Sequence, residues 1–339
     1  MKQRGNRYCP ICSTKLQRRG LTASGVQRWY CKTCSSSHTK PRHDVLRSNQ
    51  LTGFISHLLS TESQTTMSKT RQYADRTWRT NTAWCWNIVP KPKRTGEACP
   101  VLLIDGTIVG GIVCLISRTP SCVIDWRWAT YEASATWDTL LCTIPEPLVV
   151  VCDGQKGMIL SIGRYWPHTR IQRCLFHVWL NMKAKLTLHP QTEAGQELLK
   201  HYRTIWQVET PEAAQDWAIH FEALYTEHGE FLRQRTVNQY SKPGQRKWWY
   251  THRDVRSAYR QLDKLLADEQ LFVYTETALK VQTTQPIPRT TNYVEGGTNA
   301  PLKELLRSHR GMPLTHQQRL TEWYLYDKTE HKKPPRNFL

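Results

Sequence analysis

Two short apolar runs that each end on Asp-Gly constrain the fold of this chain more than any other feature. Residues 101–106 read VLLIDG, and residues 148–154 read LVVVCDG. Both runs are shorter than an ordinary helix and do not alternate between apolar and polar residues, so they predict strands buried on both faces. A single Asp-Gly is a common turn dipeptide. Because a carboxylate at the edge of a core is costly without a partner, two matched copies favour a shared role for Asp105 and Asp153.

The segments around these runs predict a single sheet. Strands are expected at 101–104, 111–116 and 122–129, followed by a helix at 134–143 and the strand 148–152. This is the order of the α/β ribonuclease-H-like fold, in which the first and fourth strands are parallel neighbours. The two aspartates would then lie side by side and repel each other unless a cation separated them. Mg²⁺ takes oxygen ligands, and a pair of such ions promotes phosphodiester displacement.

Positive charge is concentrated towards both ends of the chain. The net charge of the 339 residues is +19, to which residues 1–100 contribute +14, residues 101–230 contribute −4 and residues 231–339 contribute +9. A basic head and a basic tail around an acidic middle favour a polyanionic partner. The alternative is a basic surface that is merely solvated.

Four of the eleven cysteines form two C-x-x-C pairs near the start of the chain. They are Cys9, Cys12, Cys31 and Cys34. The pairs are separated by 18 residues, which is typical of a structural site for one Zn²⁺. A turn at Arg19–Gly20 and a short strand at 27–30 complete the pattern of a zinc ribbon. The other cysteines lie mostly singly in apolar runs, which favours a reducing compartment over a disulfide framework.

Residues 45–87 predict three helical pieces that resemble a helix-turn-helix with the third piece as recognition helix. In the first piece, the apolar residues between Leu51 and Leu59 fall on one face. Asp75 is expected to cap the third piece. Its tryptophans, Trp78, Trp84 and Trp86, would help fill the core side. The alternative is a plain three-helix bundle with a solvated basic face.

Basic residues follow this segment and also lie within it. Arg71, Arg76 and Arg79 are expected to face outward, towards DNA. Residues 91–100 are interpreted as a linker, whose basic residues Lys91, Lys93 and Arg94 are further candidates for DNA contact. No apolar run is long enough to cross a membrane, and the first residues show no apolar segment of a secretory signal.

Four stretches of the chain resemble the Mutator-type DDE transposases of bacterial insertion sequences. They read LIDGT, VVCDGQKGM, RCLFHVWLNMKAKL and RTTNYVEGGTNAPLKELLRSHRGM. Their order and context match from about residue 45 to the C-terminus, and one branch of the family carries a zinc ribbon in front. The resemblance implies that Asp105, Asp153 and Glu295 are catalytic acids that bind two Mg²⁺ or Mn²⁺ ions per active site. It also implies that Cys174 and His177 are the Cys-x-x-His element of the family.

The role of Cys174 and His177 has two interpretations. They could form half of a zinc site, but no second pair lies near them in the sequence. We favour the other interpretation, in which they pack and hydrogen-bond beside the active site and support its shape.

The 141 residues between Asp153 and Glu295 exceed what a simple ribonuclease-H core needs. Helical patterns within 187–285 predict an all-α insertion there, which the resemblance also implies. Inside it, Lys247, Trp248 and Trp249 either stack on unpaired bases and hold phosphates or belong to a hinge packed in the core. The next helix would bring further cations near the cleaved strand, namely Lys303, Arg307 and Arg310.

A second glutamate competes for the place of the third acid. Glu193 lies 40 residues after Asp153 and would suit a core without an insertion. It follows Thr192, a plausible helix cap, and an acid in a first helical turn is favoured by the helix dipole whatever its function. Asn292 can cap a helix that starts near Glu295, and the two glycines that follow permit close approach of a ligand. We therefore prefer Glu295.

Together these features predict a DDE transposase that binds terminal inverted repeats and catalyses metal-dependent DNA cleavage and strand transfer. It would act as a homodimer on double-stranded DNA, in the bacterial cytoplasm near the nucleoid. The alternatives are a non-catalytic DNA-binding regulator derived from a transposase and a structure-specific nuclease. The expected domains are a zinc ribbon (1–40), a helix-turn-helix (45–90), a linker (91–100), the core (101–186 and 286–330), the insertion (187–285) and a tail (331–339).

Overall fold

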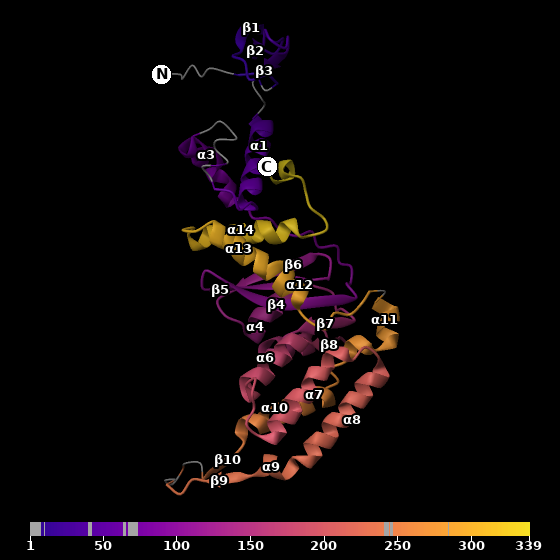
Figure 1. Cartoon of the computed structure of the whole chain (residues 1–339). Helices are drawn as coiled ribbons and strands as arrows, with labels where there is room; N and C mark the ends of the chain where they lie inside the picture. Colours follow the sequence, from indigo (N-terminus) through magenta and orange to yellow (C-terminus); the bar gives the residue numbers. More distant parts are fainter. Residues whose placement is uncertain are drawn as a thin grey trace. The chain divides into compact units, whose positions relative to one another are not determined.

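The computed structural model describes residues 8–9, 11–39, 43–63, 66, 74–240, 244, 247–283 and 285–339 (Figure 1). The chain divides into two compact units. One unit comprises residues 1–88 and 333–339, and the other comprises residues 89–332. In the described part of the chain, no helix is both long and apolar enough to cross a membrane.

The first unit opens with a small antiparallel sheet in the order β1-β2-β3. Its strands are β1 (Gln17–Leu21), β2 (Gln27–Tyr30) and β3 (Ser37–Thr39). The predicted strand at 27–30 is confirmed, but the predicted turn at Arg19–Gly20 is wrong. Gly20 lies inside β1 at an irregular point of the pairing, where its φ of +65° suits glycine. The chain reverses instead at Thr22–Val26, where the Thr22 amide donates to the Val26 carbonyl oxygen at 2.8 Å.

Helix α1 (His43–Leu58) and helix α3 (Asp75–Thr82), which is followed by the 3₁₀ helix η1 (Ala83–Asn87), pack together as predicted. Leu51, Phe54 and Leu58 of α1 are buried. The predicted tryptophans contact this helix, since the Trp86 ring meets Phe54 edge-on at 4.7 Å and Trp84 Nε1 donates to Gln50 Oε1 at 3.1 Å.

Two details of this unit differ from the predictions. Asp75 is the first residue of α3 and not its cap, a position that Ala74 takes without a side-chain hydrogen bond. The predicted tail contains a 3₁₀ helix, η5 (Pro335–Phe338), which contacts α1. The middle piece of the predicted helix-turn-helix lies largely outside the described residues.

The second unit is built on a five-stranded mixed sheet in the order β6-β5-β4-β7-β8. Its strands are β4 (Val101–Val109), β5 (Ile112–Arg118), β6 (Val123–Ala129), β7 (Val149–Cys152) and β8 (Arg170–Arg173). The first three form an antiparallel meander, and β7 pairs in parallel with both β4 and β8. The predicted strands, their order and the parallel pairing of the first with the fourth are therefore confirmed.

The sheet is covered on both faces, which explains why its central strands lack alternation. Leu102, Ile104 and Val150 share one core with α4 (Ser134–Leu141) and α5 (Lys156–Tyr165). Val101, Leu103 and Val151 belong to the core on the opposite face, with α6 (Leu175–Leu186) and the helices that follow it. Residues with odd and even numbers in β4 thus point into different cores.

Residues 187–285 are mostly helical. They do not form a separate core, because their buried side chains belong to the same core as Val101, Leu103, Val151 and α6. The helices are α7 (Glu193–Arg203), η2 (Thr204–Gln207), α8 (Pro211–Glu227), α9 (Gly229–Arg233), α10 (Arg253–Ala267), η3 (Val273–Thr275) and α11 (Thr277–Thr283). The all-α prediction misses an antiparallel ribbon, β9 (Arg235–Val237) with β10 (Trp248–Tyr250). Figure 1 shows this ribbon beyond α9, at the end of the helical segment away from the sheet.

The chain then returns to the five-stranded sheet. Short α12 (Asn292–Val294) runs into a π-helical turn, η4 (Glu295–Asn299), and on into α13 (Ala300–Ser308). The last helix of this unit is α14 (Leu314–Asp327), and Trp128 Nε1 of β6 donates to its Glu322 Oε1 at 3.0 Å.

The contact of α4 with α5 gives a test of this packing. A Cβ on Gly157, in the first turn of α5, would lie 2.8 Å from the backbone nitrogen of Ser134 and 3.0 Å from the carbonyl carbon of Ala133. Because backbone has to shift, Gly157→Ala should lower the free energy of unfolding by about 1–3 kcal/mol. Gly163→Ala, in the same helix but with open space around it, should raise it by about 0.5–1 kcal/mol. Urea unfolding of both variants measures the difference, and equal stabilities would contradict the close contact.

Candidate metal and DNA sites

The two aspartates lie on adjacent parallel strands. In the β4–β7 pairing, Leu103 is opposite Val151, so continuation by two residues brings position 105 beside position 153. Asp153 directly follows β7, as predicted. Asp105 does not end its strand, because β4 continues to Val109 in its pairing with β5. Its side chain is only 8% exposed, whereas Asp153 is half-buried.

The surroundings of Asp105 oppose its negative charge. Burial, followed by the charge of Asp153 and then that of Glu295, raises the pKa of Asp105 to about 7, although His177 acts in the opposite direction. The carboxylate accepts hydrogen bonds from the Gly106 amide at 2.9 Å and from Asn299 Nδ2 at 3.3 Å. Asp153 and Glu295 therefore both lie close enough to Asp105 to act on its charge.

Glu295 opens the π-helical turn η4. Its Oε1 accepts a hydrogen bond from Thr291 Oγ1 at 2.5 Å and lies 3.6 Å from His177 Nδ1. The predicted cap by Asn292 is wrong, since Thr291 occupies that position and Asn292 is the first helical residue. Asn292 instead lies against Gly296, where a Cβ would be 2.7 Å from its Oδ1.

Cys174 and His177 lie at the start of α6, directly after β8. Both contact the segment that carries Glu295, Cys174 through Thr291 and His177 through Glu295 itself. Cys174 is fully buried, directly before α6, and its sulfur accepts from the Thr291 amide at 3.2 Å. The hydrogen bond with Cys174 raises the pKa of His177 to about 9, against the effect of burial, with the charges of Glu295 and Asp105 adding to it. The ligand atoms of Cys174, His177 and Glu295 lie within 4.8 Å of one another. This arrangement agrees with a supporting role and also offers a mixed donor set to a metal.

Glu193 lies elsewhere. It is exposed at the first position of α7, where Thr192 Oγ1 accepts from the Gly195 amide at 3.3 Å. The helix-start interpretation of Glu193 is thus confirmed.

Two polar residues near the acids have no counterpart in the sequence predictions. Asn299 is 6% exposed and touches Asp105, and its Oδ1 has no hydrogen-bond partner. Glu132, between β6 and α4, lies over Gly106, where a Cβ would be 2.1 Å from Glu132 Oε1. Burial and then the charge of Asp153 raise the pKa of Glu132. In the sequence, the glycine at position 106 indicated that another group approaches the backbone there, and this group is Glu132. Asn299 follows Glu295 by four residues, a spacing that places two side chains on the same face of a helix.

The donor set around Asp105 fits a hard divalent cation. Asp153 and Glu295 act on Asp105 electrostatically, and the unpartnered Asn299 Oδ1 is a neutral oxygen beside it, although the carboxylates of the three acids do not all lie within 4.8 Å of one another in the described chain. Within the described ranges, neither Asp105 nor Asp153 forms an ion pair with lysine or arginine. A bound cation would remove the repulsion that raises the pKa of Asp105.

The four N-terminal cysteines form the second group of potential ligands. Their sulfur atoms lie within 4.8 Å of one another, with Cys9 3.4 Å from Cys34 and Cys12 3.3 Å from Cys31. A tetrahedral site with Zn–S bonds of about 2.3 Å has S–S edges of about 3.8 Å, close to this spacing. The knuckles therefore fit one Zn²⁺, as predicted.

The predicted DNA-contacting residues are mostly exposed. Arg71 lies outside the described residues. The exposed residues are Arg76 and Arg79 in α3, Lys91, Lys93 and Arg94 before β4, Lys247 and Trp249, Lys303 and Arg307 in α13, and Arg310 after it. Trp248 is half-buried. Because α13 directly continues the turn that carries Glu295, its two cations lie on the same continuous stretch as that acid.

The β9–β10 ribbon alternates guanidinium groups with aromatic rings. Arg235 lies over Trp248 at 4.0 Å and near Tyr250 at 5.9 Å, and Arg256 covers Tyr250 at 4.0 Å. Trp249 on the other face of β10 is 42% exposed. Neither tryptophan is fully buried, so this segment does not form part of the buried core.

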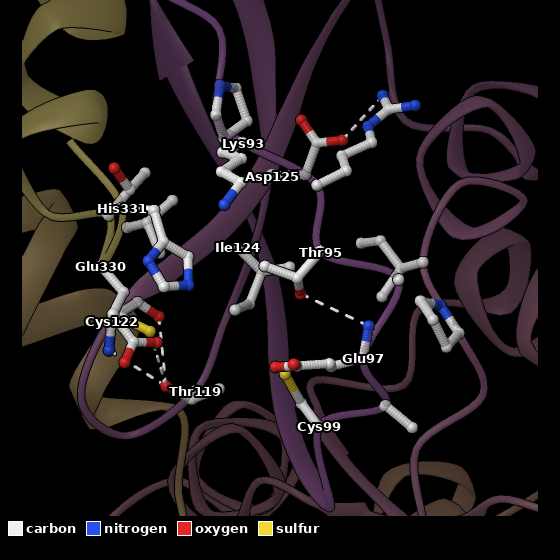
Figure 2. Close-up of a pocket in the computed structure, with 18 of the residues that line it drawn as sticks. Lys93, Thr95, Glu97, Cys99, Thr119, Cys122, Ile124, Asp125, Glu330 and His331 are labelled. Atoms are coloured by element: carbon white, nitrogen blue, oxygen red, sulfur yellow. Dashed lines mark hydrogen bonds and ion pairs between the residues drawn. The ribbon is translucent and has the colours of Figure 1, made fainter. Parts of the chain in front are cut away.

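The predicted linker residues line a cavity of about 590 Å³ at the start of β4 (Figure 2). Lys93 is among the residues that line it, and Arg94 donates to the buried Asp125 at 2.9 Å. Asp125 also pairs with Arg127 at 2.7 Å. Residues 92–100 therefore pack within the second unit, to which they belong, and part of the charge of Arg94 is satisfied there. None of the three predicted acids lines this cavity.

Comparisons with known proteins agree with the predicted resemblance. Residues 123–237 match the family described as "Transposase, Mutator family". A 146-residue stretch is 31% identical to "Transposase for insertion sequence element IS905" of Lactococcus lactis subsp. lactis (strain IL1403). That alignment covers 38% of this chain and 36% of the relative, so the chain spans little more than a third of the relative's length. The resemblance to Mutator-type transposases is thereby confirmed, and the matched family segment includes Asp153, Cys174 and His177.

The sulfur geometry predicts one tightly held zinc ion. The purified chain should contain about one Zn²⁺ by elemental analysis, because four convergent thiolates form a closed structural site. Ser at both Cys9 and Cys31 should remove it. Ser at both Cys114 and Cys152, which are buried in the sheet, is the matched control and should leave the zinc content unchanged. Full zinc occupancy in the Cys9/Cys31 variant would exclude this site.

Proposed function

We propose that this chain is a DDE transposase that binds the terminal inverted repeats of an insertion sequence and cuts and joins DNA strands. The observation that carries the proposal is the buried Asp105, whose pKa is raised by burial and then by the neighbouring Asp153 and Glu295, in a chain of which residues 123–237 match the Mutator family. A group of acids without lysine or arginine partners in the described chain is suited to divalent cations, which phosphodiester cleavage needs.

The strand order supports a ribonuclease-H-like core. An antiparallel meander with two parallel strands added beside the first, β6-β5-β4-β7-β8, is the arrangement expected of that fold. In this proposal, residues 101–186 and 286–330 form the core, and residues 187–285 are an insertion between the second and third acids. The insertion shares the hydrophobic core of one sheet face, so it would hold a fixed position on the sheet.

Asp105, Asp153 and Glu295 would hold two Mg²⁺ or Mn²⁺ ions. When bound, such ions supply an activated water or 3′-hydroxyl and stabilise the leaving oxygen. Asn299 and the Gly106 amide orient the carboxylate of Asp105, while Thr291 and His177 orient that of Glu295. The Cys174 sulfur accepts a hydrogen bond from the Thr291 amide, and it so supports the position of Thr291 beside Glu295.

The DNA would be held by basic surfaces on both units. The zinc ribbon and the α1–α3 helices, in a helix-turn-helix-like arrangement, would recognise the terminal repeats, with Arg76 and Arg79 towards the duplex. Lys303, Arg307 and Arg310 would contact the strand to be cut, and the β9–β10 ribbon would offer Lys247, Trp248 and Trp249 to unpaired bases. Because two ends are handled together, a homodimer in the cytoplasm, near the nucleoid, is proposed.

Two other functions would use the same sites. A DNA-binding regulator derived from a transposase would bind the repeats without cleaving them, but all three acids are present. A structure-specific nuclease would cleave without joining. A strand-transfer assay with labelled terminal repeats and a target plasmid distinguishes the three, since joined products are expected only from a transposase.

The identity of the third acid gives a matched pair of variants. Glu295→Gln should abolish Mg²⁺- or Mn²⁺-dependent cleavage, by about a hundredfold or more, because it removes a charge that would bind metal. Glu193→Gln, at the capped start of α7, should leave cleavage within about twofold, as for a surface helix position. Both variants should still bind the repeat DNA. Loss of cleavage in Glu193→Gln alone would move the third acid there and overturn the insertion.

The proposed DNA role of α3 predicts a change in salt dependence. Ala at both Arg76 and Arg79 should weaken binding to the repeat and lower the slope of log K against log salt by about 2, since each phosphate contact contributes about one. The control is Ala at both Lys200 and Arg203, which are exposed on α7 and have no proposed DNA contact. Fluorescence anisotropy over a salt series measures the slope, and equal slopes for both variants would remove α3 from the interface.

A further inference from the structure

The π-helical turn η4 carries two polar side chains of the proposed site. Glu295 is its first residue and Asn299 is its last. Asn299 Nδ2 contacts Asp105 at 3.3 Å, and the charge of Glu295 raises the pKa of Asp105. A π turn is a rare insertion into helical geometry that needs other contacts to hold it. The shape of this turn therefore determines how Asn299 meets Asp105 and how Glu295 lies beside His177.

Arg118, the last residue of β5, reaches into this turn from the sheet. Its Nη1 donates to the Tyr293 carbonyl oxygen and, at 2.6 Å, to Thr298 Oγ1. Its Nε and Nη2 donate to the carbonyl oxygens of Thr119 at 2.9 Å and Pro120 at 3.1 Å. A single guanidinium thus joins the end of β5 to α12, directly before the turn, and to Thr298 within the turn.

The fit of Arg118 explains one of the glycines after Glu295. A Cβ on Gly297 would lie 3.3 Å from Arg118 Nη1, closer than most side-chain contacts. Arg118 itself is 6% exposed. Within the described residues it forms no ion pair with a carboxylate, so its charge is balanced by neutral oxygen atoms. A buried guanidinium is costly unless its donors are used, and here the turn and the strand end use them.

We propose that Arg118 is a positioning residue that holds the π turn in shape and so sets Asn299 against Asp105 and Glu295 beside His177. Its consequence for metal binding rests on the function proposed above. The competing interpretation is that Arg118 only stabilises the fold, in which case its loss would lower the melting temperature and leave the affinity of the acids for metal unchanged.

Thr298 offers a test that leaves the arginine in place. Thr298→Ser keeps the hydroxyl that accepts from Arg118, whereas Thr298→Val removes it and keeps a similar volume. Binding of Mn²⁺ to the full-length, zinc-loaded chain is followed by electron paramagnetic resonance, together with the melting temperature. Thr298→Val should raise the Mn²⁺ concentration at half-saturation by about tenfold, as for residues that orient metal ligands, and Thr298→Ser by less than about twofold. Arg118→Lys, with fewer and differently directed donors, should weaken Mn²⁺ binding at least as much as Thr298→Val.

Two variants of the acids separate this inference from the proposed function. Asp105→Asn and Glu295→Gln should both lose Mn²⁺ binding. If they bind Mn²⁺ like the unchanged chain, the proposed metal site is wrong. If they lose it while Thr298→Val and Arg118→Lys keep the unchanged half-saturation, the positioning role of Arg118 is overturned. Should Arg118→Lys fail to fold, the comparison of Thr298→Val with Thr298→Ser alone tests the positioning role of Arg118. Thr298→Ser controls for the effect of substituting position 298.

Discussion

The parallel pairing of β4 with β7 is the interaction on which the proposed site depends. It joins two strands that are separated by the meander and α4, and it extends the register so that Asp105 and Asp153 become neighbours. The helices on both faces exclude water from these strands, which leaves Asp105 8% exposed. The same burial that stabilises the sheet therefore raises the pKa of this carboxylate and makes a cation favourable beside it.

The sheet was predictable because its strands are buried on both faces. Continuous apolar runs such as VLLI and LVVVC identify central strands without reference to distant contacts, and their order then implies which are neighbours. The cysteine knuckles were predictable for a similar reason, since the C-x-x-C spacing itself brings two sulfurs together. In both cases the signal lies in a few consecutive residues.

The features that the sequence did not reveal depend on contacts between distant segments. Arg118 and Thr298 are 180 residues apart, and Asp105 and Asn299 are 194 residues apart. The π turn is one residue wider per turn than an α-helix and follows an ordinary helical pattern, so periodicity does not distinguish it. The β9–β10 ribbon has only three residues per strand, too few to show alternation.

The placement of Arg118 also explains why, among the described residues, no arginine competes with a metal ion for the carboxylates of Asp105 and Glu295. An arginine paired directly with Glu295 or Asp105 would neutralise them and compete with a metal ion. Arg118 instead directs its donors to two strand-end carbonyls, a turn carbonyl and a hydroxyl. In the described chain, the basic side chain that lies beside a carboxylate of the three acids is His177, 3.6 Å from Glu295, and it can lose its proton, unlike arginine. The fold thus separates the group that shapes the turn from the groups that would bind the metal, which is why altering Thr298 can test the first without touching the second.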